Sequence, residues 1–194
     1  FGIKDPRMSR LLPFWKEVFR RCGLQPVFLI CSRDPVSVAQ SLERRDGFPM
    51  EKSYFLWMEH LLCALSEVDG FPACAISFDR LLGAPSQELQ RIAAQLGLVL
   101  NEGISFQDYA ESFLDARLCH FQNRLDDLEV IPGLLDQAVE LYAALEGLAV
   151  DQVALGDALW GERLAHMRQR FIDLGSLYQL MAGFDGQLSR CEKR

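Results

Sequence analysis

The sequence predicts an α/β fold in which a parallel sheet is flanked by helices and followed by an α-helical C-terminal extension. Two short apolar runs rich in β-forming residues, 26–31 and 72–78, indicate buried parallel strands. The segments between and after these runs carry apolar residues at helical spacing. Because strands and helices alternate along the first hundred residues, we expect right-handed crossover connections.

Start and stop signals place the first elements. A short strand ending near Lys4 precedes an amphipathic helix over 9–22, which Gly23 ends. After the strand at 26–31, Asp34 is suited to cap a helix and Pro35 suits its first turn. The remaining predicted helices are 35–45, 51–68, 86–96 (capped by Ser86 and ended by Gly97), 107–114, 133–147 and 151–181.

Composition narrows the class of protein. The 194 residues carry a net charge of −7, which argues against broad binding to nucleic acid. No run of 18 apolar residues is present, so we expect no membrane span. None of the six cysteines forms a C-x-x-C pair, and the histidine spacing gives no metal-binding set. We therefore expect reduced thiols and a cytoplasmic location, with zinc or disulfide sites as the alternatives.

The junction after the second strand carries the clearest chemical signal. Ligands of open α/β sheets bind at the carboxyl ends of strands, where a helix N-terminus also favours an anion. Arg33 lies at that edge, and Ser41 and Arg45 share one face of the following helix. These three side chains are placed to converge on one anionic group. The alternative is that Arg33 pairs with a carboxylate and has only a structural role.

The same residues resemble a known family. Arg33-(x7)-Ser41, directly after a strand, is similar to the 3′-phosphate motif of sulfotransferases that use 3′-phosphoadenosine 5′-phosphosulfate (PAPS). Arg45 is similar to an arginine of the protein-tyrosine branch of that family. The upstream segment 4–7 (Lys-Asp-Pro-Arg) resembles the Lys-Asp-Pro segment of the same branch and of bacterial sulfotransferase-like proteins. Residues 76–82 are similar to the family's Tyr-Glu-Asp/Gln-Leu strand end. The resemblance covers roughly residues 1–148, and it implies a P-loop-like sheet.

This resemblance implies roles for individual residues. Arg33 and Ser41 would hold the 3′-phosphate of PAPS, with Arg45 assisting. Lys4 would neutralise charge on the departing phosphate oxygen, and Asp5 is a candidate acceptor-side base, although it is equally suited to cap the next turn. Phe78 stands where the family has a cofactor-contacting tyrosine. Because phenylalanine has no hydroxyl group, one hydrogen bond to the cofactor would be lost. No metal is implied.

The chain also departs from the family. It contains no Gly/Ser/Thr-rich phosphosulfate loop and no Gly-x-x-Gly-Asp-Trp-Lys segment. We expect the missing N-terminal strand and its loop to lie upstream of Phe1, so these residues alone are expected to bind nucleotide weakly and to be inactive. Two other functions stay open: a non-catalytic nucleotide-binding or interaction module, and a P-loop small-molecule kinase.

The sequence also divides the chain in two. Residues 1–148 form the predicted sulfotransferase-like domain, and 149–194 form a helical extension whose apolar stripe over 151–181 either packs on the domain or contacts a partner. The acceptor, a small molecule, glycan, lipid or peptide carrying a hydroxyl or amine, is not specified. His60, residues 117–120 (Arg-Leu-Cys-His) and His166 are weaker site candidates.

Overall fold

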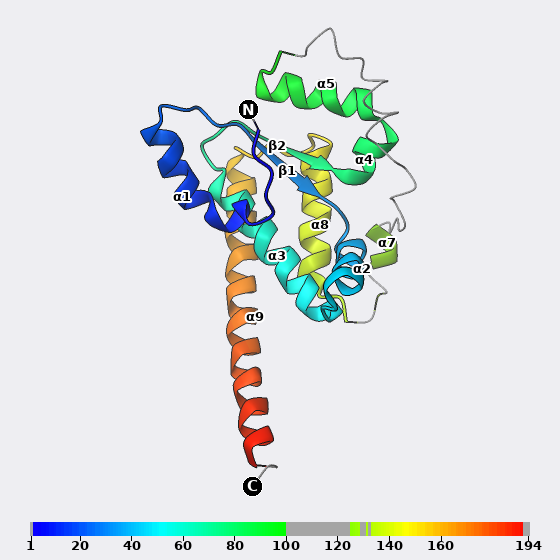
Figure 1. Ribbon diagram of the computed structural model, residues 1–194. Helices are drawn as coiled ribbons and strands as arrows, with labels where there is room; N and C mark the ends of the chain where they lie inside the picture. Colours follow the sequence, from blue (N-terminus) through cyan, green and yellow to red (C-terminus); the bar gives the residue numbers. More distant parts are fainter. Residues whose placement is uncertain (1, 100–124, 129–130, 132, 192–194) are drawn as a thin grey trace.

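A computed structural model describes residues 2–99, 125–128, 131 and 133–191. The fold is α/β and mostly helical. The strands in the described residues, β1 (Phe28–Ser32) and β2 (Ala73–Ser77), are parallel, with Phe28 opposite Ala73 (Figure 1). The helices are α1 (Met8–Arg21), α2 (Pro35–Asp46), α3 (Met50–Glu67), α4 (Phe78–Gly83), α5 (Pro85–Leu96), α7 (Leu125–Leu128), α8 (Asp136–Ala149) and α9 (Ala158–Cys191).

Helices cover the two faces of the sheet unequally. Side chains alternate between faces along a strand. Ile30 and Ala75 join a large core formed with α3 and α8, whereas Cys74 and Ile76 pack with two residues of α5 in a separate small cluster. Leu29, on the α5 side of β1, stays 48% exposed because α5 packs on β2. The structure supports the parallel sheet that the sequence predicted, and it does not establish a P-loop-like fold.

The predicted strand near Lys4 is wrong. Residues 2–5 have no regular secondary structure, and α1 begins at Met8. A strand requires a neighbour for its backbone hydrogen bonds, and within the described residues β1 pairs only with β2. The local residue pattern favoured a strand, but no pairing partner fixes one here.

The capping predictions had mixed outcomes. Asp34 caps α2 as expected, since its Oδ1 accepts a hydrogen bond from the Ser37 amide at 2.8 Å. Gly97 ends α5 in the left-handed conformation, with φ of 62°. Ser86, however, is not the cap of α5, because the helix begins one residue earlier at Pro85 and Ala84 takes the cap position without a side-chain bond. The strand predicted through Phe78 ends at Ser77, and α4 follows it directly.

The C-terminal helix contributes to the main core. The predicted helix over 151–181 is instead a turn followed by α9, which begins at Ala158. Trp160, Leu164 and Met167 are buried in the same core as α3 and α8. This favours packing of the apolar stripe on the domain for the first turns of α9. The proposed division at 148/149 stays a prediction.

Some predictions lie outside the described residues, namely the helix at 107–114 and the segment 117–120. Within the described residues, no helix is long and apolar enough to cross a membrane. In the same part of the chain, Cys22, Cys31, Cys63 and Cys74 are free thiols.

Candidate functional site at the carboxyl edge of the sheet

Arg33 lies at the carboxyl edge of the sheet, as the sequence predicted. It directly follows β1, and its guanidinium carbon lies 4.7 Å from the centroid of the Phe78 ring, which begins α4 after β2. The indole Nε1 of Trp57 donates a hydrogen bond to the Arg33 carbonyl at 3.1 Å. An arginine over an aromatic face gains cation–π energy. Residues that follow two adjacent strands therefore form one contact.

The N-terminus of α2 offers fewer donors than the sequence suggested. Pro35 has no amide hydrogen, and the Ser37 amide already donates to Asp34. The Val38 amide donates to the Asp34 carbonyl at 3.2 Å. This leaves the Val36 amide as the donor of the first turn, and the Asp34 carboxylate is fully buried beside it. An anion at this edge would depend mainly on the Arg33 guanidinium.

Ser41 and Arg45 lie further along α2. Ser41 is exposed, so its hydroxyl is open to a ligand. The Arg45 guanidinium binds the Asp46 carboxylate through contacts of 2.7–3.1 Å, and this ion pair lowers the pKa of Asp46. The pair is solvent-exposed, so an incoming phosphate can compete with it at low cost. Convergence of Arg33, Ser41 and Arg45 on one anion stays a prediction.

The predicted catalytic pair, Lys4 and Asp5, lies in the irregular segment before α1. Lys4 is exposed. Asp5 accepts hydrogen bonds from the side chain and the amide of Arg7, and these bonds lower its pKa to about 2. His60 contacts this segment and the first turn of α1, with Nδ1 3.0 Å from the Pro6 carbonyl and 2.8 Å from the Ser9 hydroxyl. Asp5 is thus held by a neighbour two residues away, whereas His60 fixes α3 to the start of the chain.

A half-buried acidic cluster near the strand ends, Glu146 and Asp79, was missed by the sequence reasoning. Burial raises the pKa of Glu146, on α8, and the nearby Asp79 charge adds to the rise, while hydrogen bonds from Ser77 and Tyr142 oppose it. Burial, and then the charges of Glu146, Asp34 and Asp79, raise the pKa of Tyr142. A carboxyl group with a raised pKa can serve as an acid or a base near neutral pH. Glu146 stands in a helical apolar pattern and gave no sequence signal.

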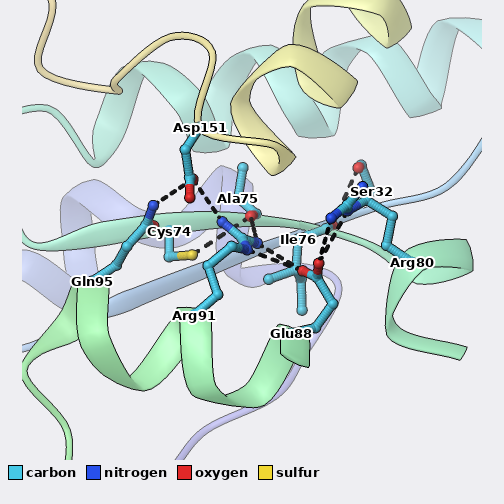
Figure 2. A network of polar contacts seen from close by, with 9 residues as sticks. All are labelled: Ser32, Cys74, Ala75, Ile76, Arg80, Glu88, Arg91, Gln95 and Asp151. Carbon is cyan, nitrogen blue, oxygen red and sulfur yellow. Dashed lines mark hydrogen bonds and ion pairs between the residues drawn. The ribbon is translucent and has the colours of Figure 1, made fainter. Parts of the chain in front are cut away.

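A second polar network holds α5 against β2. Glu88 is 2% exposed and binds Arg80 at 2.8 Å and Arg91 at 3.0 Å. Arg91 also donates to the Ala75 carbonyl and binds Asp151, in the turn after α8. Figure 2 shows these side chains meeting along the edge of β2. The contacts are complementary and largely internal, which indicates a structural role.

Comparisons with known proteins give no family for the chain. No protein-family model, no curated protein and no solved structure matches it. Within the described residues, no group of three or more His, Cys, Asp or Glu side chains is arranged to bind a metal ion.

Proposed function

We propose that the chain is part of an enzyme that transfers the sulfuryl group of PAPS to a hydroxyl or amine acceptor. The observation that carries the proposal is the stacking of Arg33, after β1, on Phe78, after β2. This contact places a charged, planar donor group at the sheet edge where α/β proteins bind ligands. The motif resemblance of Arg33 and Ser41 supplies the nucleotide's identity.

The 3′-phosphate of PAPS fits the chemistry of Arg33. A guanidinium binds phosphate oxygens through two parallel hydrogen bonds, and stacking on Phe78 limits the rotamers that must be ordered on binding. Ser41 would add a hydroxyl donor, and Arg45 would exchange Asp46 for the phosphate. PAPS itself supplies the activated sulfuryl group, and Lys4 would offset the negative charge on the leaving phosphate.

The acceptor-side base is better assigned to Glu146 than to Asp5. A carboxylate whose pKa is about 2 is almost always ionised at neutral pH but is a weak base. Glu146, whose pKa burial raises, is closer to the range that proton transfer requires. We retain Asp5 as a residue that orders the segment carrying Lys4.

A second candidate is a nucleotide-binding or interaction module without catalysis. One observation favours it: Asp5 and Arg45 are both held in ion pairs. Such a module would bind 3′-phosphoadenosine 5′-phosphate but would not accelerate sulfuryl transfer.

Calorimetry with two nucleotides tests the proposal. Wild-type protein should bind 3′-phosphoadenosine 5′-phosphate at least about 30-fold more tightly than adenosine 5′-phosphate, since a charged hydrogen bond contributes about 2 kcal/mol. Arg33→Ala should remove this difference by weakening only the first ligand. Arg163→Ala, at an exposed arginine on α9, is the matched control and should bind like wild type.

Three outcomes would count against the proposal. Equal affinities of the two nucleotides in wild type would show that the protein has no site for the 3′-phosphate. If the Arg33→Ala variant, with its fold verified by circular dichroism, kept the preference for 3′-phosphoadenosine 5′-phosphate, Arg33 would not be part of the 3′-phosphate site. Tighter binding of ATP than of either nucleotide would favour the kinase.

A further inference from the structure

The backbone of Arg33 lies in a buried part of the carboxyl edge. The residues on either side of it, Ser32 and Asp34, are 3% and 0% exposed. Ser32 is paired with Ser77 at the end of β1, and the Asp34 side chain accepts the hydrogen bond from the Ser37 amide. A carbonyl group in such a place needs a donor, because an unpaired buried carbonyl costs free energy comparable to a lost hydrogen bond. The Arg33 carbonyl therefore depends on a hydrogen bond from a neighbouring element.

The donor for this carbonyl comes from α3. The indole Nε1 of Trp57 donates to the Arg33 carbonyl at 3.1 Å. Nε1 is the only polar atom of a tryptophan side chain. Phenylalanine or leucine at position 57 would also fill the core, but neither could donate this bond. The hydrogen bond is thus what tryptophan adds beyond packing at this position.

The main core fixes the indole of Trp57. Its side chain is 6% exposed, and its neighbours on α3, Tyr54 and Met58, are 2% and 1% exposed in the same core. The helix packs against α1, α2 and β1, and Figure 1 shows its first turns beside α2. Close-packed side chains hold one rotamer on average. The Nε1 atom is therefore a donor with a fixed position and direction.

The backbone contact and the side-chain contact of Arg33 are coupled. The guanidinium carbon lies 4.7 Å from the centroid of the Phe78 ring. Which rotamers a side chain can adopt depends on the backbone torsions of its own residue. Because the indole of Trp57 holds the Arg33 carbonyl, it restrains the torsion ψ of Arg33 and with it the rotamers that bring the guanidinium over Phe78. Trp57 can thus act on a bound anion through Arg33 without touching the anion.

We propose that Trp57 is a positioning residue for the 3′-phosphate of the nucleotide: its indole fixes the backbone of Arg33, so that the guanidinium is oriented over Phe78 before the phosphate binds. The inference rests on the proposed function, because it adds a residue to the same site. A binding group that is ordered in advance loses less entropy on association. A bidentate contact between guanidinium and phosphate requires the correct orientation of the guanidinium plane. Loss of the indole donor should therefore weaken the contact with the 3′-phosphate and spare the rest of the nucleotide.

Substitutions at two buried tryptophans separate positioning from packing. Trp57→Phe keeps an aromatic ring in the core and removes the donor. Calorimetry should show about fivefold weaker binding of 3′-phosphoadenosine 5′-phosphate, the effect of one lost hydrogen bond, with unchanged binding of adenosine 5′-phosphate. Trp160→Phe, at a tryptophan that is 3% exposed on α9, is the matched control. It removes the same volume from the same core and should leave both affinities unchanged.

A second variant keeps the shape of the side chain, in case Trp57→Phe disturbs the core. Replacement of Trp57 by 3-benzothienylalanine retains the two fused rings and exchanges the N–H group for a sulfur atom that cannot donate. This variant should bind 3′-phosphoadenosine 5′-phosphate about fivefold more weakly than wild type and adenosine 5′-phosphate equally well. Circular dichroism and urea unfolding verify that each variant is folded.

The indole N–H signals in NMR spectra give an independent readout on the wild-type protein. The chain has three tryptophans, Trp15, Trp57 and Trp160, and therefore three such signals. The Trp57 signal, identified by its absence in Trp57→Phe, should shift more with 3′-phosphoadenosine 5′-phosphate than with adenosine 5′-phosphate. The Trp160 signal should respond to neither nucleotide. A tryptophan with only a packing role would not distinguish the two nucleotides.

The outcomes separate this inference from the proposed function. If wild type prefers 3′-phosphoadenosine 5′-phosphate and both variants at position 57 keep the full preference, the inference is overturned and the proposed function stands. Equal weakening of both nucleotides, or an equal response of the Trp57 signal to both, also overturns it, because either result indicates a structural role alone. If wild type shows no preference, the proposed function fails and the inference fails with it.

Discussion

At the scale of single residues, the surroundings of each ionisable group decide its chemistry. The sequence placed Asp5 and Arg45 in a site by residue type and spacing. In the structure each has a partner one or two residues away, Arg7 and Asp46. Glu146 gave no sequence signal, yet partial burial raises the pKa of its carboxyl group. Local sequence reveals which groups are present, but their burial depends on residues far along the chain.

Glu146 makes stability depend on pH. Its pKa is raised in the folded protein from an ordinary value of 4.5, so the folded state holds a proton that the unfolded state releases. This contribution is complete below about pH 4.5 and is lost as the pH rises through the folded pKa. Glu146→Gln should flatten that decline, as measured by urea unfolding at several pH values.

The matched control for this pH dependence is Glu162→Gln, at an exposed glutamate on α9. This variant should keep the pH dependence of wild type. A Glu146→Gln protein whose stability declined with pH as steeply as wild type would show that Glu146 is already ionised in the fold.

At the scale of elements, the ends of helices could be predicted where a single residue close to the end, such as a glycine or a capping side chain, determines them. Gly97 ends α5 because its φ of 62° is easily reached only by glycine. Asp34 caps α2 through its own side chain. Ser86 failed as a cap because Pro85 already suits the first helical position, which moves the start of α5 back by one residue. The strand near Lys4 failed because strands depend on a partner outside the local sequence.

Two glycine substitutions with opposite expected effects test the local rules. Gly97→Ala should destabilise the protein by about 1 kcal/mol, because alanine is strained at this φ although no atom lies within 4 Å of the added carbon. Gly175→Ala, inside α9 and equally free of close neighbours, should stabilise the protein by up to about 1 kcal/mol. Urea unfolding checks both, and a shared sign would contradict this explanation.

At the scale of the whole molecule, the first turns of α9 are part of the main hydrophobic core. Trp160 is 3% exposed and lies in one cluster with residues of α3 and α8. Phe171, further along α9, meets Phe55 of α3 with ring centroids 6.0 Å apart. Figure 1 shows α9 running past α3 and extending beyond the other helices. Its first turns therefore stabilise the same fold that carries Arg33.

Trp160→Ala tests this coupling. Removal of a buried tryptophan should cost roughly 3–5 kcal/mol of unfolding free energy. The neighbouring Leu159 is 75% exposed, and Leu159→Ala should change stability by less than about 0.5 kcal/mol. If 149–194 were an independent extension, Trp160→Ala would leave the urea unfolding of the remaining chain unchanged.

The sequence by itself determined the local features: a strand at 26–31, observed as β1 at 28–32, most helices with their stops, and the position of Arg33 close after a strand. These follow from side-chain periodicity and from backbone rules that act within a few residues. Tertiary structure decided the rest: that the segment before α1 is not a strand, that Arg33 lies over the Phe78 ring, and that Glu146 is half-buried near Asp79. Each of these depends on contacts between residues distant in sequence, whose pairing and burial no local pattern specifies.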